Sequence, residues 1–141
     1  MKLAQSIRRT GAPALAFTAI ISATFSLSAY AADVVLTGAQ EVPPVTTSAQ
    51  ASGTINVGSD MAVSGSIKTT GINATAAHIH EAPMGKNGPV IVPLVKNGDT
   101  FSVAPNSKLT DAQYKAYKAG DLYVNVHSDA NKGGEIRAQL K

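Results

Sequence analysis

The feature that most constrains the fold of this chain is a series of short runs rich in Val, Ile and Thr, separated by Gly, Asn, Asp and Pro. Such runs, punctuated by turn residues, are typical of β-strands. Asn97-Gly98 lies between two of the runs and is a strong hairpin signal. The pattern predicts strands at 34–37, 51–57, 61–69, 74–80, 89–95, 100–103, 121–127 and 134–140.

One segment, LTDAQYKAYKAGD, has the pattern of a helix. Thr110 and Gln113 have the spacing of a capping box, and Gly120 is placed to end the helix. The helix is too short to be more than a crossover between strands. The fold class is therefore predicted to be all-β: an antiparallel Greek-key sandwich or barrel of seven or eight strands with one short crossover helix.

The first residues have the pattern of an export signal. Lys2, Arg8 and Arg9 form a basic start, an uncharged apolar run follows, and AYA fits a small-x-small cleavage site. We therefore expect a cleavable signal peptide at 1–31 and one domain at 32–141, periplasmic or secreted, without a membrane anchor after cleavage. The Arg-Arg pair leaves both the general and the twin-arginine export routes open.

Charge and composition exclude several classes of function. The net charge of +3 comes from the basic residues of the predicted signal, and the rest of the chain has nine Lys or Arg against nine Asp or Glu. The chain after the predicted signal therefore has no basic patch of the kind that predicts binding to nucleic acid or to an anionic membrane. The absence of Cys excludes disulfides, and the scarcity of aromatic residues argues against a platform for sugars or single-stranded bases.

The three histidines are the candidate metal ligands. His78 and His80 lie two residues apart in a predicted strand, so they share a face. His127 ends another strand and alternates away from its apolar residues, as do Tyr123 and Asn125. Imidazole nitrogens bind an ion at about 2.0–2.1 Å, and copper has the highest affinity for such sites, with zinc as the alternative. The alternative interpretation is that the histidines are ordinary polar residues on an exposed strand face.

Four other residues are weaker candidates. Met84 is a possible soft ligand, or a side chain that packs on the sheet. Glu81 and Asp129 each follow a histidine and are either acceptors that orient it or ordinary turn carboxylates. Arg137 is either a group that attracts a small anion or a solvated strand residue.

Three segments resemble a known family. LTGAQEVPPV, AAHIHEAPMGKNGPVIVPL and LYVNVHSDANKGGEIRAQL are similar, in order and spacing, to the signature blocks of the CHRD (chordin) domain family. The resemblance covers essentially all of the chain after the predicted signal. It implies an immunoglobulin-like β-barrel and a small exported bacterial protein.

A more distant resemblance concerns chemistry. HIHE followed by VNVH is similar to the copper-binding histidine pattern of copper–zinc superoxide dismutases. This implies that His78, His80 and His127 bind copper, and that Arg137 is a loose counterpart of the arginine that guides superoxide. The chain has only three His and no Cys, so the implied site is a mononuclear, copper-only type with an open position.

Two hypotheses for the function follow. In the first, an exported CHRD domain binds one transition-metal ion through its three histidines, for metal handling or as a copper-only, superoxide dismutase-like oxidoreductase. In the second, it is a non-catalytic extracytoplasmic binding or structural module whose histidines are structural. Whether the three rings converge on one point distinguishes the two.

Overall fold

The computed structural model describes residues 30–141, which form a closed barrel of eight strands with one short α-helix. Every strand pairing is antiparallel, which confirms the predicted fold class. The elements are β1 (Tyr30–Thr37), the 3-10 helix η1 (Gly38–Gln40), β2 (Gln50–Val57), β3 (Val63–Thr70), β4 (Ala74–Glu81), β5 (Val90–Asn97), β6 (Thr100–Val103), α1 (Asp111–Ala119), β7 (Leu122–Ser128) and β8 (Ile136–Leu140).

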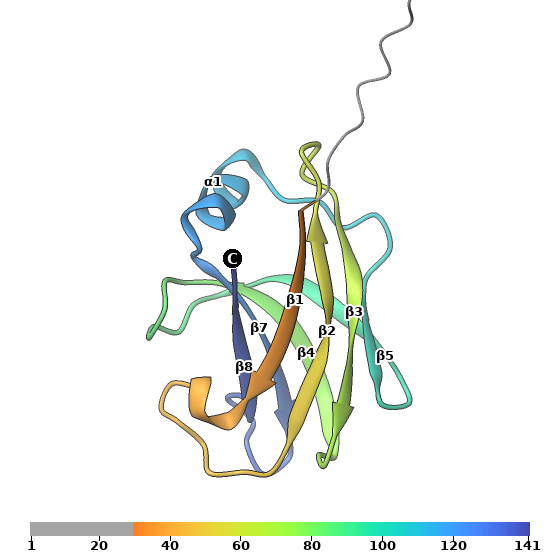
Figure 1. The fold of residues 1–141 in the computed structure, drawn as a ribbon, viewed down its shortest axis with the longest axis vertical. Helices are drawn as coiled ribbons and strands as arrows, with labels where there is room; N and C mark the ends of the chain where they lie inside the picture. Colours follow the sequence, from red (N-terminus) through yellow and green to blue (C-terminus); the bar gives the residue numbers. More distant parts are fainter. Residues whose placement is uncertain (1–29) are drawn as a thin grey trace, which may run out of the picture.

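The order of strands around the barrel is β1-β2-β3-β6-β5-β4-β7-β8 (Figure 1). Strands β4, β5 and β6 are joined by short connections, while β3 and β7 lie on either side of this group. That arrangement is a Greek key. It makes β7 the direct neighbour of β4, although almost fifty residues separate equivalent positions of the two strands.

The apolar core consists mainly of aliphatic side chains, together with the rings of Phe101 and Tyr117. Alternate residues of each strand point inward, and the interior includes Leu36, Ile55, Ile67, Phe101 and Val124, all of which are buried. The third strand begins two residues later than predicted, since Met61 adopts a positive φ of 68° in the turn before it.

The helix has the ends that its sequence predicts. The Thr110 side chain accepts from the Gln113 backbone N–H and the Gln113 side chain accepts from the Thr110 N–H, which completes the capping box. Gly120 closes the helix in the left-handed conformation, with φ of 81°. The helix crosses from β6 to β7 at one end of the barrel (Figure 1).

The outer face of β4, β7 and β8 is covered by loops. Residues 38–49, 82–89 and 129–135 lie over it and bond to one another: the Asn87 side-chain nitrogen donates to the Val42 carbonyl at 2.8 Å, and the Thr47 hydroxyl donates to Glu135 at 2.7 Å. Consequently five consecutive residues of β7, from 122 to 126, are buried on both faces of the strand. The barrel therefore has a second, partly polar buried layer outside its apolar core.

The predicted signal peptide, 1–31, lies outside the described residues except at its last two positions, so it stays a prediction. Within the described part of the chain, no helix has the length and hydropathy to cross a membrane.

Candidate metal centre

The outer face of β4 and β7 brings all three histidines together. The register pairs His78 with Asn125 and Ala76 with His127, so His78 and His127 are diagonal neighbours on adjacent strands. One ring nitrogen from each of His78, His80 and His127 can be chosen so that the three atoms lie within 4.8 Å of one another. The three histidines therefore lie close enough together that they could hold one metal ion.

Backbone carbonyls fix the proton positions of two of the rings. His80 Nδ1 lies 2.9 Å from the Gly88 carbonyl oxygen, and His127 Nδ1 lies 2.9 Å from the Lys132 carbonyl oxygen. A carbonyl only accepts, so each Nδ1 carries the proton and each Nε2 of the neutral ring presents a lone pair. His80 Nε2 is buried and has no hydrogen-bond partner among the described residues.

The contact between the other two rings has the spacing of two metal ligands. His78 Nδ1 lies 3.1 Å from His127 Nε2. Two nitrogens bound to one ion at about 2.0–2.1 Å would stand at this separation with an angle of about 100° at the ion. Without an ion, a single proton on His78 Nδ1 can occupy the gap and make a hydrogen bond.

The environment of His78 and His80 favours their neutral forms. Burial lowers the pKa of His78, and the nearby His127 and His80 rings lower it further. Burial also lowers the pKa of His80. Because a metal binds the unprotonated nitrogen, a lowered histidine pKa favours metal binding at neutral pH.

Tyr123 supports His80 from β7. The two rings stack with their centroids 4.8 Å apart and an interplanar angle of 8°. The Gly88 N–H donates to the Tyr123 hydroxyl at 3.1 Å, while the Gly88 carbonyl accepts from His80. One glycine of the 82–89 loop therefore contacts both rings of the stack through its backbone.

Arg137 is buried, so its interpretation as a solvated strand residue is wrong. It does point outward from β8, but the covering loops leave it only 1% exposed. Its guanidinium carbon lies 3.4 Å from the centroid of the Tyr123 ring, and its two terminal nitrogens donate to Asn87 and Gln139, each at 3.2 Å. Its role in guiding an anion stays a prediction.

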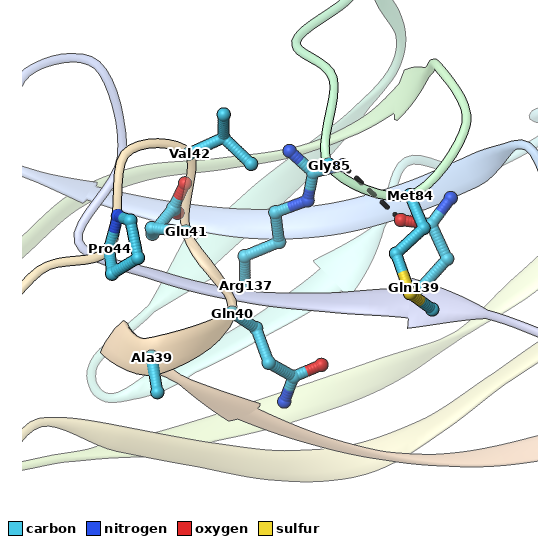
Figure 2. A pocket seen from close by; sticks show the side chains of 9 residues that line it. All are labelled: Ala39, Gln40, Glu41, Val42, Pro44, Met84, Gly85, Arg137 and Gln139. Atoms are coloured by element: carbon cyan, nitrogen blue, oxygen red, sulfur yellow. Dashed lines mark hydrogen bonds between the residues drawn. The ribbon is translucent and has the colours of Figure 1, made fainter.

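A pocket of about 440 Å³ lies beside this arginine, on the side of the 38–49 and 82–89 loops. Figure 2 shows Arg137 and Gln139 joined by their hydrogen bond, with Glu41 and Met84 in the surrounding walls. Met84 is 66% exposed and lines this pocket. Its assignment as an extra metal ligand stays a prediction.

Main-chain carbonyls contact the Nδ1 atoms of His80 and His127, and no hydrogen bond joins Glu81 or Asp129 to these rings among the described residues. Glu81 follows His80 directly in β4, so its side chain points to the opposite face. Asp129 lies exposed in the turn after β7. The carbonyls of Gly88 and Lys132 make the contacts that Glu81 and Asp129 would make in the first of their two interpretations.

Sequence reasoning missed the polar groups buried beside the histidines. Asn125 was placed on the histidine face by strand alternation, but nothing indicated its burial. Glu41 comes from the 38–49 loop, and burial raises the pKa of its carboxyl group. Glu41 Oε1 and Asn125 Oδ1 are both buried without a hydrogen-bond partner among the described residues.

Comparison with known proteins agrees with the signature blocks. The family model described as the CHRD domain matches residues 32–140. The chain belongs to the CHRD domain family. The three histidines of this CHRD domain all lie within the matched region. Neither the curated proteins nor the solved structures contain a significant match to the chain.

Proposed function

We propose that this CHRD domain binds one transition-metal ion through His78, His80 and His127, with copper favoured and zinc as the alternative. The observation that carries the proposal is the convergence of one nitrogen from each ring within 4.8 Å, across two strands that are distant in sequence.

The unpaired nitrogen of His80 supports an ion at this point. Leaving a buried acceptor without a partner costs about 1–3 kcal/mol, and His80 Nε2 is such an acceptor. A metal ion would satisfy this lone pair and those of the other two rings together. Among the three rings, the buried lone pair of His80 meets no donor of the described residues, whereas that of His127 can accept from His78.

Imidazole ligation favours copper and zinc, and copper binds most tightly in the usual order of affinities. We propose metal handling outside the cytoplasm as the role of the site. His78 and His127 are only half-buried, which leaves the site approachable from solvent. That exposure is the observation in favour of the second candidate, a superoxide dismutase-like activity at a copper ion.

The test is a titration of tag-free protein with Cu²⁺ and Zn²⁺, followed by elemental analysis after removal of free ion. Wild type is expected to retain about one equivalent, while His80→Ala and His127→Ala retain much less. Gln50→Ala, an exposed change on β2, is the matched control. Equal retention by wild type and the histidine variants would reject the metal site and favour a structural module.

The dismutase candidate needs a separate measurement. Copper-loaded wild type is expected to remove superoxide faster than His80→Ala at the same total copper. Equal rates would mean that loosely bound copper is responsible and that the domain is not the catalyst.

A further inference from the structure

Asn125 occupies the centre of the outer face that carries the histidines. It lies in β7, two residues before His127, and its register partners are His78 on β4 and Arg137 on β8. It is only 2% exposed. An uncharged amide therefore lies between His78 and Arg137 in the buried layer outside the barrel.

The oxygen of this amide has no hydrogen-bond partner. Asn125 Oδ1 and His80 Nε2 are both buried and unpaired among the described residues. Asn125 is directly opposite His78 and is the diagonal neighbour of His80 on the same face of β4 and β7. Since the proton of His80 is on Nδ1, both atoms present lone pairs and neither brings a hydrogen. A cation placed between the two atoms would satisfy both lone pairs.

Glu41 accounts for the direction of the amide. A Cβ built on Gly134 would stand 2.5 Å from both Asn125 Nδ2 and Glu41 Oε1, so the amide nitrogen is turned toward the carboxylate. A carboxylate accepts and does not donate, so it favours the N–H₂ side of the amide. The oxygen is thereby directed away from Glu41.

We propose that Asn125 Oδ1 is the fourth ligand of the metal centre and that Glu41 is the positioning residue that holds the amide. This inference rests on the proposed three-histidine site and extends it to a set of three nitrogens and one oxygen. Four ligands complete the tetrahedral set typical of zinc. An amide oxygen is a hard ligand, so this set favours divalent ions over Cu⁺.

The test compares Asn125→Asp, Asn125→Leu and Glu41→Gln with wild type, and uses Asn56→Asp on β2 as the control. Affinities for Zn²⁺, Cu²⁺ and Cu⁺ are measured by competition with chelators, and the Cu²⁺ ligands are followed by electron paramagnetic resonance. Circular dichroism reports the fold of each variant.

Asn125→Leu is expected to weaken Zn²⁺ and Cu²⁺ binding by roughly 10- to 100-fold, which is the usual loss of affinity when a group around a metal is removed. Cu⁺ binding is expected to change little. Asn125→Asp is expected to bind divalent ions more tightly and to shift the Cu²⁺ spectrum. Glu41→Gln is expected to lower the ratio of Cu²⁺ to Cu⁺ affinity, because a second amide no longer selects one orientation of Asn125.

The outcomes separate this inference from the proposed function. If wild type binds no metal, the proposed function fails and the inference with it. If wild type binds metal but Asn125→Asp and Asn125→Leu keep its divalent affinity and Cu²⁺ spectrum, the inference alone is overturned. Should Asn125→Leu fail to fold, the nearly isosteric Asn125→Asp decides: an unchanged spectrum rejects the oxygen ligand.

Discussion

His78 Nδ1 lies 3.1 Å from His127 Nε2, although the two residues are 49 positions apart in the chain. This contact depends on the Greek-key connection, which places β7 directly beside β4. A proton or a metal ion can occupy the gap, and the two compete for the same lone pairs.

Metal binding should stabilise the fold. A ligand that binds only the folded state at 100 times its dissociation constant adds about 2.7 kcal/mol to the free energy of unfolding. We expect Cu²⁺ or Zn²⁺ to raise the melting temperature of wild type, and a chelator to reverse the rise. His80→Ala should melt at the same temperature with and without the ion.

The stability of the metal-free protein should fall as the pH drops below about 6.5, the usual pKa of histidine. Because the pKa values of His78 and His80 are lowered in the fold, the unfolded chain binds more protons below this pH and is favoured. Urea unfolding with chelator at pH 7.5, 6.0 and 5.0 measures the slope. A double His78→Ala/His80→Ala variant should flatten it, and an unchanged slope would contradict the assignment.

Glu41 should act in the opposite direction at lower pH. Its raised pKa means that the folded state holds a proton more tightly than the unfolded chain, so its carboxylate destabilises the fold at neutral pH. This cost diminishes as the pH falls toward 4.5, the usual value for the group. Glu41→Gln should remove that contribution, as seen by comparing its urea unfolding with wild type at pH 7.5 and pH 4.5.

Gly88→Ala should disturb the centre without removing a ligand. A Cβ at this position would meet the Glu81 carbonyl oxygen at 1.8 Å, so the backbone that contacts His80 and Tyr123 must move. We expect metal affinity to fall by roughly 10- to 100-fold, measured by chelator competition. Gly133→Ala has open space around its Cβ and should bind like wild type.

Phe101→Ala should weaken the barrel itself. The Phe101 ring is fully buried in the interior, and truncating such a ring costs about 3–5 kcal/mol. Chemical unfolding should show this loss, whereas Val95→Ala, at an exposed position of β5, should cost little. A small effect for Phe101→Ala would mean that the interior can collapse around the missing ring.

The strands, the helix ends and the shared face of His78 and His80 follow from local patterns, because alternation and capping depend on residues close in sequence. The buried layer outside β7 does not follow from local patterns. Alternation correctly turns Asn125 and Arg137 away from the barrel interior, but their burial depends on loops whose path is set by contacts such as that between Asn87 and Val42. The meeting of His80 with His127 was implied by resemblance and required the strand order.

All three histidines lie outside the barrel wall, beneath loops and not within the aliphatic interior. An ion bound there would therefore have a route to solvent that leaves every strand pairing intact. Because His78 and His127 are only half-buried, we expect ion exchange to need at most a local opening of these loops and to be orders of magnitude faster than global unfolding. A domain of this kind would bind a metal ion tightly at equilibrium and still exchange it quickly.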